Sequence, residues 1–178
     1  MALKTATNKI NIIRFCAQSE GEHINTIKIL DILQRDATVP VARIADQVGL
    51  SQTPCWKRIQ KHEEAGVIRA RVALLNPDAL GLSLTAFVMV EAVEHTAEWR
   101  TEFLAVTETL EPVRDIYRLA GTHDFMLRVV VPDMSAFDAF YDNLTSSIRL
   151  RSVSSVFALE QMKASTALPL SGLFPSPN

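Results

Sequence analysis

The chain has 178 residues, of which 48% are hydrophobic and 21% are charged, with a formal net charge of −2. These values are typical of a globular protein of one or two domains and exclude a highly charged disordered chain. No apolar run approaches the roughly 20 residues of a membrane-spanning helix, and the N-terminus lacks the apolar core of a signal peptide.

The charge is divided unevenly between the two halves of the chain. Residues 1–83 hold 11 Lys and Arg against 8 Asp and Glu, a net of +3, whereas residues 84–178 hold 7 against 12, a net of −5. This split indicates two domains with different partners, and the basic excess of the first permits contact with phosphates. Cys16 and Cys55 are the only cysteines, which favours a reduced, cytoplasmic protein in which Cys55 is buried as a small hydrophobe.

Three helices are predicted in the first half, after an N-terminal extension of residues 1–22. Residues 23–36 carry apolar side chains at helical spacing, with Asn25 or Thr26 as a cap. Pro40 suits the first turn of a second helix, which Gly49 ends.

The third helix is expected to begin at Ser51 as its cap and to end at Gly66. Cys55, Ile59 and His62 share one face of it at about 100° per residue, so the opposite face, with Thr53, Lys57 and Gln60, is left for solvent or a partner. The next segment, VIRARVALLN (residues 67–76), alternates and is rich in β-branched residues, which predicts a strand. The helical domain thus covers residues 23–73, and residues 74–83 form a hinge.

The second half, residues 84–164, follows a different pattern. Strands are predicted at residues 84–92, 113–120, 125–131 and 153–159, and helices at 98–110 and 135–146. The order β-α-β-β-α-β is that of the ferredoxin-like fold, in which two helices cover one sheet face and leave the other for a partner. The Pro- and Ser-rich tail, residues 165–178, is expected to be loosely ordered.

The segment VARIADQVGLSQTPCWKRIQKHEEAG (residues 41–66) has the layout of a DNA-reading helix-turn-helix, with the motif over residues 41–60. Such a helix presents its N-terminal side chains to base edges in the major groove. Base reading is expected of Gln52, Thr53 and Gln60, and phosphate contacts of the cationic side chains. Two amphipathic helices that merely pack on a core are the structural alternative. The predicted DNA-binding residues are Arg43, Ser51, Gln52, Thr53, Trp56, Lys57, Arg58, Gln60 and Lys61.

The sequence resembles the Lrp/AsnC family of bacterial transcription regulators through ILDILQRD, IADQVGLSQTPCWKRIQKHEEAGVI, ALLNPDALGL and GTHDFMLRVVVPDM. The resemblance implies an α+β protein with an N-terminal winged helix-turn-helix domain and a C-terminal ferredoxin-like βαββαβ domain that binds effectors and oligomerises. It also implies homodimers that assemble further, as a tetramer of dimers, and respond to amino acids. Within the family the chain is most similar to a regulator of cysteine degradation, on the run from SQTPCWKR through AFVMVEAVEHTAEW.

Three positions depart from the family pattern. Thr26 replaces an Asp of the first helix, and Thr38 replaces an Arg before the second helix, which removes a phosphate contact. His62 replaces a Leu of the recognition helix and is expected to be a satisfied, partly buried histidine rather than a pH or metal site.

The turn Gly121–Asp124 is the predicted effector site. Gly121 permits a tight turn whose N–H groups hold a carboxylate, and Asp124 pairs with an ammonium group. From the residues alone a plain hairpin turn is the stronger interpretation, whereas the resemblance places the ligand beside this turn, between dimers. The resulting effector-binding residues are Gly121, Thr122, His123 and Asp124, with Ser154 and Ser155 as weaker candidates.

Catalytic, metal and cofactor motifs are absent from the sequence. The four histidines are scattered, and no GxSxG, Walker-type loop or GxGxxG occurs. We therefore expect no enzyme, no metal and no cofactor, but a transcription regulator that binds double-stranded DNA and an amino-acid effector, acting in the cytoplasm at the nucleoid without a membrane partner. The alternative is a ferredoxin-like small-molecule-binding protein or enzyme whose helical front domain serves protein contacts only.

Overall fold

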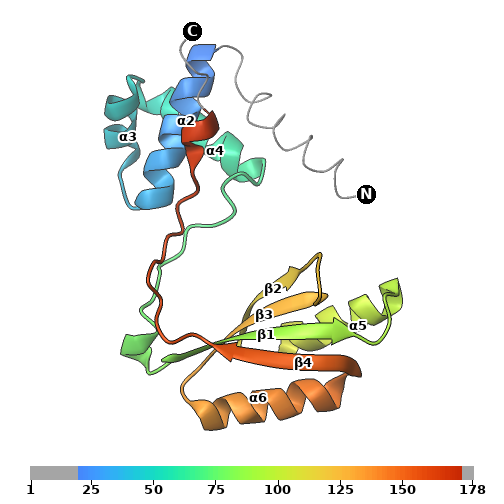
Figure 1. Ribbon diagram of the computed structural model, residues 1–178. Helices are drawn as coiled ribbons and strands as arrows, with labels where there is room; N and C mark the ends of the chain where they lie inside the picture. The colour runs from blue at the N-terminus through green and yellow to red at the C-terminus, as the bar shows by residue number, and fades with distance from the viewer. Residues whose placement is uncertain (1–19, 174–178) are drawn as a thin grey trace. The chain divides into compact units, whose positions relative to one another are not determined.

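The computed structural model describes residues 20–173 of the chain (Figure 1). The chain crosses between two compact units twice, once between Ala73 and Leu74 and once between Met162 and Lys163. The first unit combines residues up to 73 with residues from 163 onward, and the second comprises Leu74–Met162. Within the described part, no helix has the length and apolar character needed to span a membrane.

The first unit is built on three helices: α2 (Glu20–Arg35), α3 (Val41–Val48) and α4 (Gln52–Glu64). The turn between α3 and α4 depends on Gly49, whose φ of 69° is the left-handed conformation that glycine adopts without strain. The Leu50 N–H donates to the Ala45 carbonyl and closes this turn. A small core joins the three helices, made of Ile29, Leu33, Ile44, Ala45, Val48, Cys55 and Ile59.

The cap predicted for the first helix, Asn25 or Thr26, is wrong, whereas Ser51 is the N-cap residue of α4. Asn25 and Thr26 lie inside α2, because the helix begins at Glu20, within the predicted N-terminal extension. Thr26 is instead almost fully buried. Ser51 does hold the extended backbone of a cap residue before α4, but its hydroxyl makes no capping hydrogen bond.

The strand predicted over residues 67–76 does not form. The Val67 and Ile68 N–H groups both donate to the His62 carbonyl and continue the end of α4. Residues 69–81 are all exposed, and they form no regular structure apart from the short 3₁₀ turn η1 (Asp78–Leu80). A segment with strand propensity forms a strand only when it can pair with a neighbouring strand. The described part of the chain offers this segment no such neighbour.

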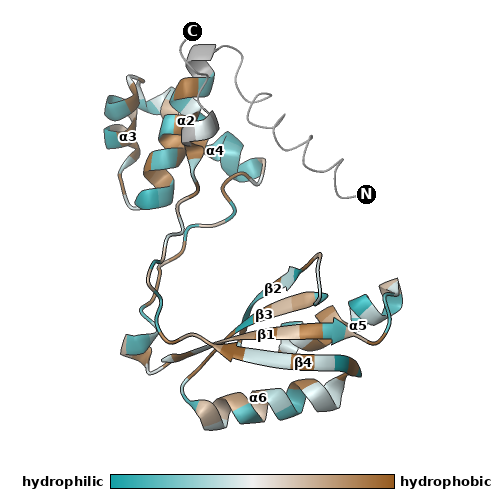
Figure 2. Ribbon diagram, in the orientation of Figure 1, coloured by the Kyte–Doolittle hydropathy of each residue, from teal (hydrophilic) through white to brown (hydrophobic). Residues whose placement is uncertain are grey.

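The second unit has the order β1 (Leu84–Ala92), α5 (Ala97–Thr109), β2 (Val113–Arg118), β3 (Phe125–Val131), α6 (Met134–Ser147) and β4 (Leu150–Phe157). The strands form one antiparallel sheet in the order β2-β3-β1-β4. This confirms the predicted ferredoxin-like arrangement. In Figure 2, β1 and β3 are mostly hydrophobic in colour, as expected for central strands.

Both helices of the second unit pack on the same face of this sheet. The buried side chains alternate along β1 and β3 and meet a stacked pair on α5, Trp99 and Phe103, with ring centroids 5.1 Å apart. Each helix begins at a side-chain cap: Thr96 accepts from the Trp99 N–H, and Asp133 accepts from the Ala136 N–H. The opposite sheet face has no such cover within the described residues.

The expectation of a loosely ordered tail is wrong for its described part. The C-terminal segment, residues 163–173, belongs to the same compact unit as the helix-turn-helix and ends in a short 3₁₀ helix, η2 (Leu170–Leu173), that contacts α2. Leu168 is hydrogen-bonded to Gln34 of α2 through both its backbone groups.

Candidate DNA interface and ligand site

The outer face of α4 is the polar face that the sequence predicts. Gln52, Thr53 and Lys57 are exposed, and Trp56 keeps 47% of its surface accessible. Cys55, Ile59 and His62 are buried on the opposite face, as predicted. An indole exposed to this extent beside glutamine and threonine side chains is typical of a surface that meets a partner.

A shallow hollow lies where the N-terminal turns of α3 and α4 meet. It has a volume of about 280 Å³ and is lined by Val41, Gln52, Thr53 and Trp56. The turn geometry therefore brings three of the predicted DNA-binding side chains together. The others lie around them, with Ser51, Arg43 and Lys61 exposed and Arg58 and Gln60 half-buried.

His62 is more deeply buried than the sequence suggests. It is 1% exposed, and its Nδ1 is buried without a hydrogen-bond partner, so the expectation of a satisfied, partly buried histidine is wrong. Burial, followed by the charges of Lys61 and Arg58, lowers the pKa of His62. The imidazole therefore acts as a neutral core side chain that supports α4 from behind.

Thr38 has a structural role before α3. Its N–H and its hydroxyl both donate to Oδ1 of Asp36, at 2.8 and 2.6 Å. These bonds hold the pKa of Asp36 below its ordinary value. The pair shapes the connection from α2 to α3, so Thr38 positions the first helix of the motif.

Asp124 ends the connection between β2 and β3 and is held on both sides. Its Oδ2 accepts the Ala92 N–H at 2.8 Å, and its Oδ1 lies 3.4 Å from Nδ1 of His95. Its backbone N–H donates to the Val90 carbonyl, and its carbonyl accepts the Leu119 N–H. The carboxylate thus has a structural task in addition to the ligand contact predicted for it.

A small polar hollow of about 20 Å³ adjoins Asp124 between the start of α5 and the β2–β3 hairpin. Sequence reasoning missed most of its lining. Arg100 and Arg118 line it, together with His95 and Glu94. The signal available in the sequence was the run EHTAEWR, which covers the loop after β1 and the first turn of α5 and is rich in polar residues.

The turn at Gly121 forms with an ordinary backbone conformation. The glycines with positive φ are Gly49, Gly66 and Gly81, so the turn at Gly121 does not require the left-handed conformation. A Cβ placed at Gly121 would meet nothing within 4 Å. Gly121 and Thr122 are exposed and His123 is half-buried, and none of the three lines the hollow beside Asp124.

Ser154 and Ser155 lie on opposite faces of the sheet. Ser154 is opposite Met89 on the uncovered face, whereas Ser155 is opposite buried Val88 and lies on the helix-covered face. Ser155 lines a groove of about 630 Å³ between β4 and α6, with Phe137 and Tyr141, and its hydroxyl is buried without a partner. The structure does not bring Ser155 together with the Gly121–Asp124 turn.

The uncovered sheet face carries apolar side chains in cross-strand rows. One row runs Tyr117, Met126, Met89, Ser154, and the next runs Asp115, Arg128, Phe87, Val156. Tyr117 is 50% exposed and Val156 59%. Arg128 donates to Asp115, so the one charged pair in these rows is neutralised within the sheet.

The two units match two family models. Residues 23–69 match a winged helix-turn-helix DNA-binding model, and residues 85–168 match the Lrp/AsnC ligand binding domain. Together the two matches cover most of the chain and separate DNA binding from ligand binding along the sequence.

Relatives of known role match across both units. The glutamate uptake regulatory protein of Zymomonas mobilis is 43% identical over 144 residues, 81% of this chain and 88% of its own length. The DNA-binding transcriptional activator DecR of Escherichia coli is 42% identical over 80% of this chain and 95% of its own. The name of DecR and the helix-turn-helix match both indicate DNA binding, which sets aside the alternative of a front domain for protein contacts only.

Solved structures share the same fold. An AsnC family transcriptional regulator from Agrobacterium tumefaciens has a TM-score of 0.80 and 50% identity, covering 84% of this chain and 97% of its own. A transcriptional regulator from Neisseria meningitidis, solved with L-methionine, has a TM-score of 0.78 and 33% identity over the same shares. The chain belongs to the Lrp/AsnC family: it is a DNA-binding transcription regulator with an N-terminal winged helix-turn-helix domain and a C-terminal ligand-binding domain.

Proposed function

We propose that this regulator binds DNA as a homodimer through the polar face of α4 and responds to a small amino acid bound beside Asp124. The observation that carries the proposal is the exposure of Gln52, Thr53, Trp56 and Lys57 over a buried face in a domain of DNA-binding type. Two such helices, one from each protomer, would lie about 34–36 Å apart and fit an imperfect palindrome.

The side chains of this face divide by chemistry into two roles. Gln52, Thr53 and Gln60 carry groups that both donate and accept, which suits base edges in the major groove. Arg43, Lys57, Arg58 and Lys61 carry cationic groups suited to phosphates. Trp56 contacts sugar or thymine methyl groups, and the open N–H groups after Ser51 meet a further phosphate.

The ligand is proposed to be a free amino acid, with cysteine or a related small amino acid as the first candidate. Asp124 offers a carboxylate to its ammonium group, and Arg100 and Arg118 offer guanidinium groups to its carboxylate. A hollow of about 20 Å³ accommodates roughly one water molecule. The remaining walls of the ligand site would therefore come from the neighbouring dimer. Alternatively, the β2–β3 hairpin would move and bring Gly121, Thr122 and His123 into contact with the ligand.

The names of the relatives do not identify which amino acid this chain binds as its effector. Regulators 43% and 42% identical to this chain carry different names, and the relative from Neisseria meningitidis was solved with L-methionine. The assignment to a cysteine-degradation subgroup therefore rests on local sequence resemblance.

Homodimers are proposed to form through the uncovered sheet face, and further association of dimers gives the tetramer of dimers. The face offers Phe87, Met89, Met126 and Val156 around the paired charges of Arg128 and Asp115. Burial of apolar side chains against a second copy supplies the main driving force for such an interface. A DNA-bound regulator would act in the cytoplasm at the nucleoid.

The test is a gel-shift titration on DNA upstream of this gene and its neighbours, at several stated salt concentrations, with each of the twenty amino acids. The Lys57→Ala/Lys61→Ala variant should bind more weakly and reduce the slope of log K against log salt by about 1.8, or 0.9 for each lost phosphate contact. Lys28→Ala, an exposed lysine on α2, is the matched control and should behave like the wild type.

Absence of a specific shift under all conditions would contradict the proposal. So would a folded double variant whose affinity and salt slope equal those of Lys28→Ala. A thermal-shift screen identifies the ligand independently, because an amino acid at 100 times its Kd raises stability by about 2.7 kcal/mol.

A further inference from the structure

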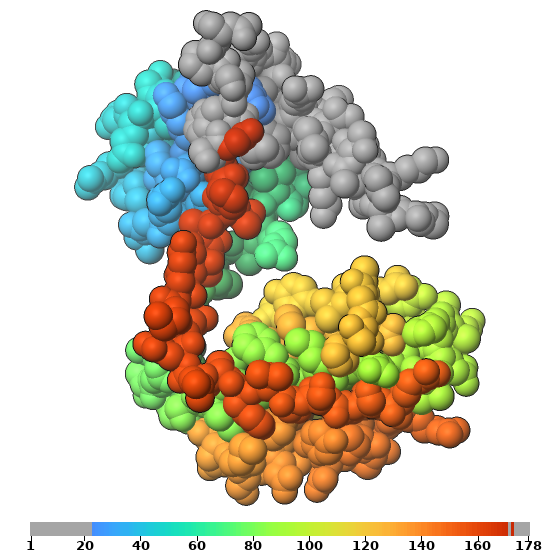
Figure 3. Space-filling model, viewed as in Figure 1, coloured from blue at the N-terminus to red at the C-terminus, as the bar shows by residue number. Residues whose placement is uncertain are grey.

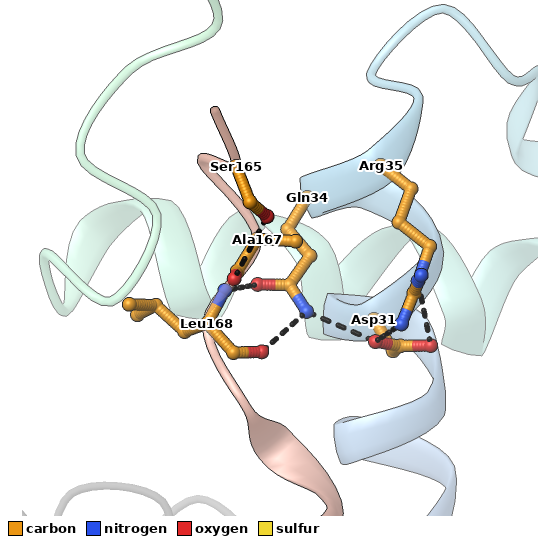
Figure 4. A network of polar contacts seen from close by, with 6 residues as sticks. All are labelled: Asp31, Gln34, Arg35, Ser165, Ala167 and Leu168. Atoms are coloured by element: carbon orange, nitrogen blue, oxygen red, sulfur yellow. Dashed lines mark hydrogen bonds and ion pairs between the residues drawn. The ribbon is translucent and has the colours of Figure 1, made fainter. Parts of the chain in front are cut away.

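The C-terminal segment is hydrogen-bonded to α2 through the side chain of Gln34, in addition to the contact of η2 with α2. Leu168 donates its N–H to Oε1 of Gln34 at 2.8 Å, and its carbonyl accepts from Nε2 of Gln34 at 3.1 Å (Figure 4). One carboxamide therefore satisfies both backbone groups of one residue, as the edge of a neighbouring β-strand would do.

The orientation of the Gln34 amide is fixed by its neighbours on α2. Nε2 also donates to Oδ1 of Asp31 at 2.9 Å, and a carboxylate can only accept, so the amide nitrogen must face Asp31. Arg35 donates to both oxygens of Asp31 from the other side. These bonds, first from Arg35 and then from Gln34, lower the pKa of Asp31 and keep it ionised. Gln34 thus presents its two ends to Leu168 in a defined order.

Residues 163–170 bury little surface. Leu168 is 69% exposed, and only Ala167 and Leu170 are half-buried among residues 163–170. Figure 3 shows the segment, in red, lying on the surface of the first unit along α2. Because apolar burial over residues 163–170 is slight, the paired hydrogen bonds are the main described attachment of this stretch to α2.

Two segments of the chain connect the sheet of the second unit to the first unit. Phe157 of β4 is paired with Ala86 near the start of β1, and the Ala158 N–H donates to the Thr85 carbonyl. The segment after β4 and the segment before β1 therefore leave the sheet at the same end. Both cross to the first unit, one covalently through Ala73–Leu74 and the other by way of Met162–Lys163 and the bond to Gln34.

We propose that the C-terminal segment is a second tether between the ligand-binding unit and the DNA-binding unit, and that Gln34 is its docking site on α2. Two links that start at one end of a sheet restrict the swing and twist of the tethered unit more than one link does. In a dimer this restriction narrows the range of distances between the two recognition helices, which raises affinity for a full palindrome. This consequence for DNA rests on the proposed function, whereas the docking itself does not.

The docking is tested by hydrogen exchange of the full-length protein. The Leu168 amide should be protected in the wild type and in Lys28→Ala, and should exchange at the rate of an open chain in Gln34→Ala. Gln34→Glu should also release the segment, because its carboxylate cannot donate to the Leu168 carbonyl and repels Asp31. Equal Leu168 exchange in the wild type and Gln34→Ala would overturn the docking site.

The tether is tested by small-angle scattering and by DNA binding. Gln34→Ala and a chain ending at Met162 should both broaden the distribution of distances between the two units. Both should lose several-fold more affinity for a full palindrome than for an isolated half-site. Unchanged scattering and an unchanged full-to-half ratio, in variants that have lost Leu168 protection, would overturn the tether. Failure of the wild type to bind any DNA would instead contradict the proposed function and leave the exchange and scattering results to decide the tether.

Discussion

Asp124 and Ala92 are joined by a 2.8 Å hydrogen bond from the Ala92 N–H to a carboxylate oxygen. The bond ties the end of the β2–β3 connection to the last residue of β1, beside the polar hollow that contains Arg100 and Arg118. The predicted ligand-binding carboxylate is therefore also a structural group. The two roles of Asp124 can be tested separately. The hydrogen bond from Ala92 requires only an acceptor oxygen, whereas binding of an ammonium group requires the negative charge.

Asp124→Asn should keep the fold but lose the response to amino acids. The Asn oxygen still accepts the Ala92 N–H, so stability should change by no more than about 1 kcal/mol, whereas the neutral side chain no longer attracts an ammonium group. Asp124→Ala should also lose the response and should cost about 1–3 kcal/mol, because Ala92 is buried and its N–H is left without an acceptor. Thermal unfolding with and without the active amino acid measures both effects. A full ligand-induced shift in Asp124→Asn would exclude a charged role for this residue.

Gly121→Ala and Gly49→Ala form a matched pair for the role of the glycines. Ala at Gly121 meets open space and an ordinary backbone, so stability should stay the same or rise by about 0.4–1 kcal/mol through the unfolded state. Ala at Gly49 must adopt a φ of 69° and should cost about 1 kcal/mol or more. Chemical denaturation compares the two variants. If Gly121→Ala were as damaging as Gly49→Ala, the turn at Gly121 would have a conformational need for glycine that its backbone does not show.

The helix-turn-helix was predictable because local signals determine it. Gly49 sets the turn, and the 3.6-residue spacing of Cys55, Ile59 and His62 defines the buried face of α4. The central strands were predictable for a related reason, since the alternation along β1 already separates the covered sheet face from the open one.

Features that depend on distant partners were not predictable in this way. The segment after Ile68 has strand propensity but no neighbouring strand, and Leu168 is fixed by Gln34, 134 residues away in sequence. The opposite orientations of Ser154 and Ser155 follow from the register of β4 against β1, which composition does not set. The hollow beside Asp124 likewise combines side chains from α5, β2 and the loop before α5.

Val156→Asp should shift the protein toward monomers. Val156 is 59% exposed in the same row as Phe87 and Arg128 on the uncovered sheet face, and a new carboxylate there would be buried without a partner in a face-to-face dimer. Light scattering coupled to gel filtration measures the mass. Ala105→Asp, which adds the same charge at an exposed position on α5, should keep the wild-type mass. A dimer of unchanged mass in Val156→Asp would place the interface elsewhere.

His62 should make the DNA-binding unit less stable in mild acid. Burial lowers the pKa of the folded imidazole, so below its ordinary pKa of about 6.5 the unfolded chain binds a proton that the folded chain excludes. The contribution of neutral His62 to the free energy of unfolding is therefore fully present above pH 6.5. It is lost as the pH falls from 6.5 toward the pKa of the folded imidazole.

The variant His62→Leu removes the titrating group and keeps the core position apolar. Hydrogen exchange of α4 amides, expressed as the ratio of wild type to His62→Leu at one pH, cancels the intrinsic pH dependence of exchange. Where exchange proceeds through unfolding of this unit, the ratio should be constant above pH 7. It should rise below pH 6.5 by up to about tenfold per pH unit, because one unit of pKa difference corresponds to about 1.4 kcal/mol. A ratio that stays flat down to pH 5 would mean that His62 takes up its proton without loss of stability, in conflict with a Nδ1 that is buried and unpartnered.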